Sequence, residues 1–231
     1  MALKARIAAL SAACTLAVGG LGVAGALPAA AGTPECGVAC TDVWSLKFGG
    51  AFVLDVYQRE AAAGQPVILF QQSPSDPAED FVIQDLGQVS DLGHGRVPGA
   101  VRENLAPELA YQIEYEPDGE ASNLCAGTEP DMTVSPYDPV ALYPCSESAS
   151  TVWVHDTNPA LGATAIGYGV LISAETDSFT DPLVLTYPAG NPTDMPRVQL
   201  DVQPLSTYSK SLPRDGTVSD SQQWSAFKPP V

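Results

Sequence analysis

The segment between residues 125 and 153 contains three short motifs in order: Cys125-Ala126-Gly127, Val140-Ala141-Leu142-Tyr143-Pro144-Cys145 and Thr151-Val152-Trp153. It opens with an apolar pair and a small residue, continues with an apolar run, and closes with a triplet that ends in an aromatic residue. Short runs of Val, Leu and aromatic residues bounded by Gly and Pro are typical of β-strands. This segment therefore predicts two or three short strands.

The same succession of motifs occurs once before this segment and once after it. The upstream copy consists of Val53-Leu54-Asp55, Val67-Ile68-Leu69-Phe70 and Glu79-Asp80-Phe81. The downstream copy consists of Val184-Leu185-Thr186, Val198-Gln199-Leu200 and Gln222-Gln223-Trp224. The step from the first motif to the second is nearly the same in all three copies, and the closing aromatics Phe81, Trp153 and Trp224 are almost evenly spaced. This spacing predicts three repeated units, at about residues 41–86, 110–156 and 170–227.

The third unit departs from the pattern, because the step from Val198 to Trp224 is much longer than the step from Val67 to Phe81. A polar insertion with Pro and Gly through Ser206–Asp220 accounts for the difference. The only helix-like stretch is Ala100–Leu109, which Pro98 and Pro107 bracket tightly. We therefore predict an all-β fold.

Composition limits the classes of partner. The chain has 231 residues, with 10 Lys and Arg against 27 Asp and Glu, for a formal charge of −17. Nucleic acids and anionic membranes both require a basic face, so neither is expected as a partner. Hydrophobic residues make up 45% of the chain, which is enough for a core, and 21 Pro with 20 Gly favour strands and turns over helices.

The N-terminal segment, residues 1–31, has the pattern of an export signal. Lys4 and Arg6 precede an uncharged Ala/Val/Leu/Gly stretch over residues 7–26, and Ala29-Ala30-Ala31 offers a cleavage site. We expect cleavage after Ala31, which leaves a secreted extracellular domain of residues 32–231. No later segment reaches the roughly 18 uninterrupted apolar residues of a membrane helix. We therefore expect no membrane association after signal removal, and a monomer.

The remaining cysteines are an even set for an oxidising compartment: Cys36, Cys40, Cys125 and Cys145. Four cysteines allow three pairings, and proximity in sequence favours Cys36–Cys40 with Cys125–Cys145. A zinc site is the alternative, but the long gap between Cys40 and Cys125 and the positions of His94 and His155 match no ligand pattern. We predict two disulfides, no metal and no cofactor.

These motifs resemble the repeats of the ricin-type β-trefoil family, in a degenerate form found in secreted actinobacterial proteins. In that family a Gln-x-Trp triplet closes each of three repeats, and Gln222-Gln223-Trp224 has the full triplet. The resemblance implies a β-trefoil with three pseudo-repeats and enlarged loops. It also implies that Phe81, Trp153, Gln222 and Trp224 are core residues, and that Cys125–Cys145 is a disulfide within one repeat.

The resemblance also implies where a sugar would bind. Ricin-type lectins hold a galactose-like ligand with an Asp after the Leu of the repeat, a Gln between apolar residues, a stacking aromatic and an Asn before the triplet. Unit 1 offers Asp55 and Phe70, but has Ile68 and Ala78 where the Gln and the Asn should be. We therefore predict Asp55 and Phe70 as ligand-binding residues.

The other two units match this pattern less well. Unit 2 keeps the aromatic residue as Tyr143 but replaces the Asp with Gly127 and the Gln with Ala141. Unit 3 keeps Gln199 but has Thr186 and Asp201 in place of the Asp and the aromatic residue.

No catalytic constellation stands out. His155-Asp156 are neighbours on a predicted strand and so point to opposite faces, and no Gly-x-Ser-x-Gly elbow occurs. We expect the acidic cluster of Glu114, Glu116, Asp118 and Glu120 on a solvated face.

We therefore predict a secreted, non-catalytic binding module for a glycan or cell-wall polysaccharide. The first alternative is a protein-interaction or protease-inhibitory trefoil that presents the loop Gly87–Pro107 to an extracellular protein. A secreted hydrolase is a further alternative.

Overall fold

The computed structural model describes residues 40–46, 51–73, 75–146, 148–156, 169–179, 181–188, 196–202 and 220–226. All of them belong to one compact part of the chain, Gly32–Val231. The predicted signal peptide over residues 1–31, Cys36, and nearly all of the Ser206–Asp220 insertion lie outside the described residues. No helix in the described ranges is long and apolar enough to cross a membrane.

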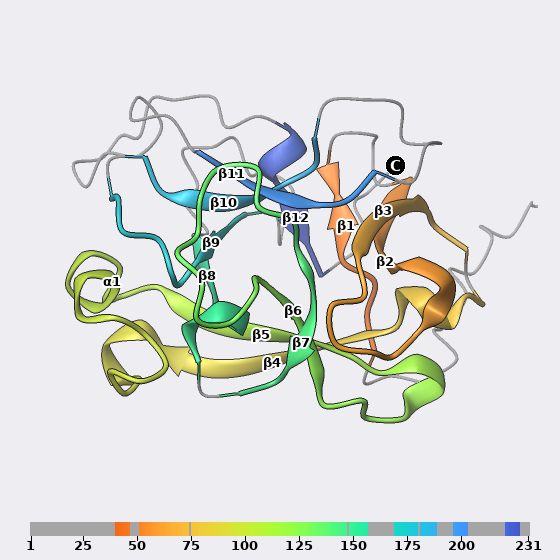
Figure 1. Ribbon diagram of the computed structural model, residues 1–231, viewed down its shortest axis with the longest axis horizontal. Coiled ribbons are helices and arrows are strands. Elements are labelled where there is room, and N and C mark those ends of the chain that lie inside the picture. Colours follow the sequence, from red (N-terminus) through yellow and green to blue (C-terminus); the bar gives the residue numbers. More distant parts are fainter. Residues whose placement is uncertain are drawn as a thin grey trace, which may run out of the picture. The chain divides into compact units, whose positions relative to one another are not determined.

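The described strands fall into three units of four (Figure 1). Unit 1 contains β1 (Trp44–Ser45), β2 (Phe52–Val56), β3 (Val67–Gln71) and β4 (Phe81–Gln88). Unit 2 contains β5 (Leu109–Tyr115), β6 (Leu124–Gly127), β7 (Ala141–Pro144) and β8 (Trp153–Asp156). Unit 3 contains β9 (Val170–Ser173), β10 (Leu183–Thr186), β11 (Gln199–Val202) and β12 (Trp224–Ser225).

Helical structure in the described residues is short. The α-helix α1 covers Gly99–Asn104. Single turns of 3-10 helix occur at Tyr57–Arg59, Pro77–Glu79, Val89–Asp91, Pro117–Gly119, Ala149–Thr151 and Asp220–Gln222. The three that end at Glu79, Thr151 and Gln222 each lie just before the closing aromatic residue of a unit, so the units also share this turn.

Strand pairing repeats from unit to unit. In each unit the first strand pairs with the second and the second with the third, always antiparallel. The fourth strand pairs with the first strand of the next unit: β4 with β5, β8 with β9, and β12 with β1. The chain thus closes on itself with threefold order, and the predicted all-β trefoil with three pseudo-repeats is confirmed.

A ring of backbone hydrogen bonds joins the three units at one point. The N–H of Val67 donates to the carbonyl of Val140 (3.1 Å), Val140 donates to Val198 (2.9 Å), and Val198 donates to Val67 (3.0 Å). All three valines are fully buried. These are the residues that open the middle motif of each repeat, so the predicted repeat register is correct.

The closing aromatics meet in the main core. Phe81, Trp153 and Trp224 belong to one buried apolar cluster. The indole N–H of Trp153 donates to the carbonyl of Ala126 (2.9 Å), and that of Trp224 to the carbonyl of Leu185 (2.9 Å). Buried polar groups need such partners, so each indole is satisfied within its own unit.

A second apolar cluster lies beneath the segment between β4 and β5. Val89, Val97 and Val101 from that segment are fully buried and pack with Val154 and Ile172 of the sheet. The helix here ends at Asn104, and β5 begins at Leu109. The helix-like stretch predicted to reach residue 109 is therefore too long, because Leu109 pairs with Gln88 and His155.

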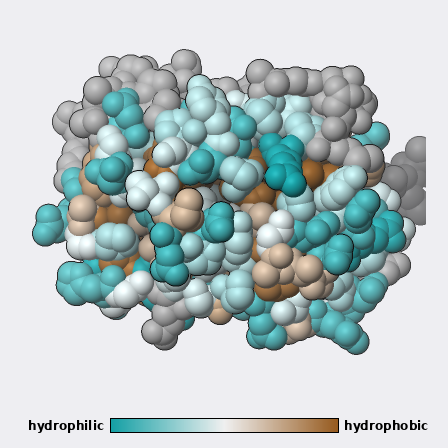
Figure 2. All heavy atoms as spheres, viewed as in Figure 1, coloured by the Kyte–Doolittle hydropathy of each residue, from teal (hydrophilic) through white to brown (hydrophobic). Residues whose placement is uncertain are grey.

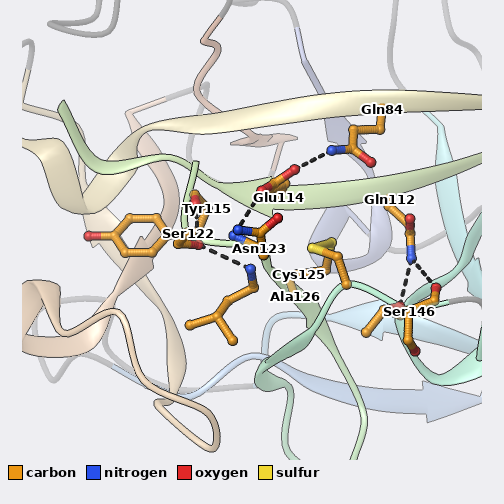
Figure 3. The surroundings of a disulfide bond; sticks show 12 residues. Gln84, Gln112, Glu114, Tyr115, Ser122, Asn123, Cys125, Ala126 and Ser146 are labelled. Atoms are coloured by element: carbon orange, nitrogen blue, oxygen red, sulfur yellow. Dashed lines mark hydrogen bonds between the residues drawn. A yellow bond between two sulfur atoms is a disulfide. The ribbon is translucent and has the colours of Figure 1, made fainter. Parts of the chain in front are cut away.

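One predicted disulfide is present. Cys125 of β6 is bonded to Cys145 just after β7, 20 residues further along the chain (Figure 3). The two strands pair directly beside it, with Cys125 opposite Tyr143. Cys40 is also disulfide-bonded, and its expected partner Cys36 lies outside the described residues.

The prediction of a solvated face for the acidic cluster is wrong at Glu114. This side chain is only 5% exposed and accepts hydrogen bonds from the side-chain amide of Gln84 and from the N–H of Asn123 (2.9 Å) (Figure 3). The reason is that residues from other parts of the chain, Gln84 of β4 and Asn123 just before β6, lie against its carboxylate. Elsewhere hydrophilic side chains cover most of the face drawn in Figure 2.

Candidate functional site

A hollow of about 340 Å³ lies on the outer side of β2 and β3 in unit 1. All four positions that the lectin pattern singles out line it: Asp55, Ile68, Phe70 and Ala78. Asp55 and Phe70, the two predicted ligand-binding residues, are therefore brought together. Its volume is at the lower end of the range for small-molecule sites.

The register of β2 and β3 explains this arrangement. Asp55 lies opposite Ile68, and Val53 lies opposite Phe70. Residues opposite each other share a face of the sheet, and successive residues alternate between faces. Leu54 and Leu69 therefore point into the core, while Asp55, Ile68 and Phe70 share the outer face.

The turn Tyr57–Arg59 forms one rim of the hollow. Gln58 and Arg59 both have left-handed backbone conformations, with φ of 59° and 58°. Such a conformation costs about 1 kcal/mol or more for a residue with a side chain. Two in succession are strained, and the side chain of Arg59, the second of them, contacts Asp76.

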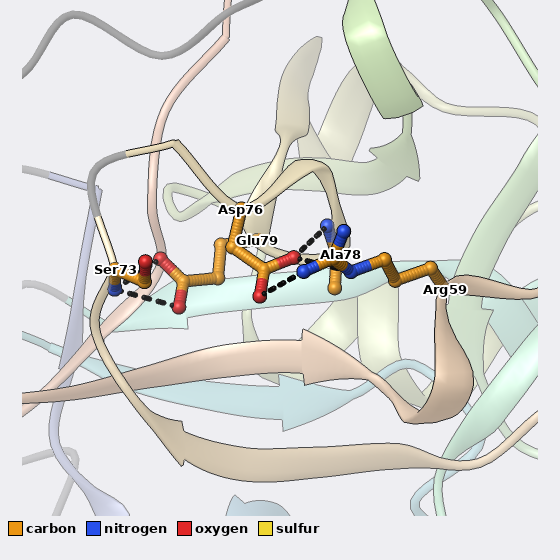
Figure 4. A network of polar contacts seen from close by, with 5 residues as sticks. All are labelled: Arg59, Ser73, Asp76, Ala78 and Glu79. Carbon is orange, nitrogen blue, oxygen red and sulfur yellow. Dashed lines mark hydrogen bonds and ion pairs between the residues drawn. The ribbon is translucent and has the colours of Figure 1, made fainter.

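Arg59 and Asp76 form a two-point ion pair (Figure 4). Arg59 Nε lies 2.8 Å from Asp76 Oδ1, and Arg59 Nη2 donates to Asp76 Oδ2 at 2.9 Å. Asp76 also accepts a hydrogen bond from the N–H of Ala78 (3.0 Å), which caps the turn Pro77–Glu79. Both oxygens of Asp76 are therefore engaged.

Behind this pair lies Glu79, which is 1% exposed. Its two carboxylate oxygens accept from the N–H of Ser73 at 2.9 and 3.0 Å (Figure 4). The pKa of Glu79 is raised from 4.5 to about 9, mainly by burial and also by the charges of Asp42, Asp55 and Asp76, against the opposing effect of the Ser73 N–H. Glu79 therefore carries a proton at neutral pH.

Asp55 is the unsatisfied member of this group. It is 5% exposed, and no described residue gives its carboxylate a hydrogen bond. The pKa of Asp55 is raised from 3.8 to about 7, mainly by burial and further by the charge of Asp76, against the opposing effect of Arg59. The oxygens of Asp55 open onto the hollow, where they can accept hydrogen bonds from a ligand.

Oxygens of Asp55, Asp76 and Glu79 lie within 4.8 Å of one another. Oxygen donors at such spacing suit a hard cation. Here, however, Arg59 and the Ala78 N–H already occupy Asp76, and Ser73 occupies Glu79. We therefore assign no metal to this group.

Unit 2 has a smaller hollow of about 160 Å³ that includes Tyr143 and Asp138. It has no carboxylate at the position of Asp55, where Gly127 stands. A Cβ at Gly127 would lie 2.3 Å from the carbonyl oxygen of Ser150, so no side chain fits there. In unit 3, Thr186 accepts a hydrogen bond from the side-chain amide of Gln222 (3.3 Å).

The histidines lie away from this hollow. His155 packs edge-on against Tyr111, with ring centroids 5.9 Å apart, beside a mostly apolar cavity of about 250 Å³. His94 accepts a hydrogen bond from Arg102 (2.9 Å) in the segment between β4 and β5.

Sequence reasoning missed Arg59, Asp76 and Glu79 as neighbours of Asp55. The Asp76-Pro77 pair was a usable signal, because Asp before Pro is typical of the start of a helical turn. That signal predicts the turn after Asp76, but it does not predict that Arg59 pairs with Asp76. The left-handed backbone at Gln58 and Arg59 has no marker in the sequence, since neither residue is Gly or Asn.

No protein-family model and no curated protein sequence matches the chain. Solved structures do match. A designed protein with threefold symmetry, ThreeFoil, is 19% identical, with a TM-score of 0.51 over 81% of this chain and 96% of that one. This likeness supports the threefold fold.

Two larger proteins contain a similar domain. A mosquitocidal holotoxin matches with 14% identity and a TM-score of 0.52, over 82% of this chain and 17% of the toxin. An exo-β-1,3-galactanase from Clostridium thermocellum matches with 13% identity and a TM-score of 0.50, over 81% of this chain and 30% of the enzyme. This chain therefore spans less than a third of either protein.

Proposed function

We propose that the protein is a secreted, non-catalytic carbohydrate-binding module, a divergent relative of the ricin-type lectins, and that it binds its ligand in the hollow of unit 1. The observation that carries the proposal is the pairing of Phe70 with the unsatisfied carboxylate of Asp55 in one hollow. An aromatic ring accepts the C–H face of a sugar, and a fixed acceptor binds its polar hydrogens.

Secretion is part of the proposal because of the export signal over residues 1–31 and the bonded cysteines. A structural disulfide such as Cys125–Cys145 is typical of an oxidising compartment. A glycan or wall polysaccharide is the ligand class that such a module meets outside the cell.

The protein-interaction alternative receives less support. It would have to rest on the exposed, mostly polar residues of the loop Gly87–Pro107, because the apolar Val89, Val97 and Val101 are fully buried. Its apolar side chains contribute to the second core instead. We therefore propose no second function.

A glycan and bacterial-wall polysaccharide array with the purified, disulfide-bonded protein tests the proposal. We expect saturable binding that Phe70→Ala weakens roughly tenfold or more. Tyr137→Ala is the matched control, because Tyr137 is an exposed aromatic residue outside the hollow. Binding that Phe70→Ala leaves unchanged would contradict the proposed site, and a folded sample that binds no glycan would contradict the function.

A further inference from the structure

The hollow of unit 1 differs from a site for a neutral sugar in a consistent way. Ile68 and Ala78 occupy the positions where the lectin pattern has two amides, so two neutral hydrogen-bonding side chains are missing. Acidic groups lie close by instead: Asp55 and Asp76 line the hollow, and Glu79 lies within 4.8 Å of both. These two positions have lost neutral hydrogen-bonding groups, and carboxyl groups outnumber cationic side chains in the lining of the hollow.

The positive charge in the hollow does not satisfy this excess. Arg59 uses both Nε and Nη2 on Asp76. Its side chain is 58% exposed, whereas Asp55 is 5% exposed and receives no hydrogen bond from any described residue. Arg59 therefore acts on Asp55 only through its charge, and the Asp55 carboxylate has no hydrogen-bond donor among the described residues.

We propose that this hollow selects a sugar with a free amino group, with the ammonium group against Asp55 and the sugar ring against Phe70. This inference rests on the proposed function and specifies its ligand class. An ammonium group supplies both the positive charge and the N–H donors that a buried carboxylate needs. Phe70 adds an apolar contact that a sugar ring can make and a simple cation cannot, so the hollow favours the sugar.

Oligomers of glucosamine and of N-acetylglucosamine are the matched pair of probes, because they share ring and linkage and differ in charge. Calorimetric titration in about 0.15 M salt limits long-range attraction to this acidic protein. We expect the amino form to bind roughly ten- to hundredfold more tightly than the acetylated form. Asp55→Asn should remove that preference.

Asp91→Asn is the control variant, because it removes the same charge from an exposed residue outside the hollow. It should bind like the wild type. Asp55→Asn should also unfold at the same temperature as the wild type or a higher one, because it removes a buried carboxylate that lacks a donor. A residue with a purely structural role would give the opposite shift.

The inference would be overturned by equal affinity for the two oligomers, by an equal loss in Asp91→Asn, or by tetralysine binding as tightly as the amino sugar. Calcium ions that bind at Asp55 while the amino sugar does not would overturn it too. If a neutral sugar binds in a Phe70-dependent manner without preference for an amine, the proposed function stands and this inference fails. If no sugar binds, both fail.

Discussion

Units 1 and 3 close with the same turn and the same aromatic position but with different polar chemistry. In unit 3 the amide of Gln222 donates to the hydroxyl of Thr186 at 3.3 Å. In unit 1 the equivalent residues are Glu79 and Asp55, two acids whose oxygens lie within 4.8 Å. One unit pairs a donor with an acceptor, whereas the other pairs two acceptors unless one takes a proton.

The comparison separates what holds the fold from what can vary. Both units keep a buried aromatic residue, a closing turn and the backbone ring through Val67, Val140 and Val198. The polar pairs outside this shared frame, Glu79 with Asp55 and Gln222 with Thr186, differ while the frame stays the same. The pair of acids in unit 1 is therefore a local feature beside its hollow, and it marks the place where we propose that the ligand binds.

The largest expected effect comes from the aromatic frame that the units share. Trp153→Ala should lower the free energy of unfolding by about 3–5 kcal/mol, because it leaves a large cavity in the core. Trp153→Phe should cost about 1–3 kcal/mol, since it leaves the carbonyl of Ala126 without its donor. Urea denaturation measures both, and a Trp153→Phe variant as stable as the wild type would contradict a role for the indole N–H.

Unit 2 contains the disulfide Cys125–Cys145. Removing it tests how much a covalent link contributes to the stability of the fold. Replacing Cys125 and Cys145 with Ser should cost about 3 kcal/mol, as expected for a closed loop of this length. Urea denaturation of the oxidised protein measures the change. A variant with wild-type stability would show that strand pairing alone holds unit 2.

Glu79→Gln gives unit 1 the residue that unit 3 has at the equivalent position, Gln222. The pKa of Glu79 is raised from 4.5 to about 9, so the folded state holds a proton that the unfolded state releases. Wild-type stability should therefore fall as the pH rises from about 4.5 to about 9. Glu79→Gln should flatten this decline, because its amide is neutral and can donate to Asp55.

Melting curves between pH 5 and pH 9 measure this difference. Asp91→Asn, which changes an exposed acid, is the control and should keep the wild-type slope. A wild-type stability that rises over this range would contradict a protonated Glu79.

Arg59→Gly should have the smallest effect on stability. It removes an ion pair in which the Arg59 side chain is 58% exposed, worth about 1 kcal/mol, and relieves a left-handed backbone of similar cost. The pKa of Asp55 should rise above its wild-type value of about 7, because Arg59 lowers it. Carboxyl NMR titration checks this, and an unchanged pKa would show that Arg59 does not act on the hollow.

Much of the fold could be predicted from the sequence because the repeat signature marks residues with fixed positions in the frame. The spacing of Phe81, Trp153 and Trp224 identified the three units, and Val67 and its equivalents gave their register. The burial of Glu114 could not be predicted, because it depends on strands that arrive from elsewhere in the chain. Alternation within β5 predicts faces but not whether both faces are covered.

The candidate site could be predicted only in part. Asp55 and Phe70 come from adjacent paired strands, so their motif was enough to place them together. Arg59 and Asp76 come from turns, where the backbone path sets which side chains meet. Arg59 has a left-handed backbone and Asp76 caps the turn Pro77–Glu79, and no repeated sequence pattern links the two residues. Their ion pair therefore becomes visible only in the folded chain.

The most direct test of the ligand site follows the methyl groups of isoleucine by NMR during a titration with glucosamine oligomer. Ile68 lines the hollow, whereas Ile172 is fully buried in the second core. The proposed site predicts a saturable shift of the Ile68 methyl signal, an unmoved Ile172 signal, and loss of the shift in Asp55→Asn. Saturable binding that leaves Ile68 unmoved would contradict it.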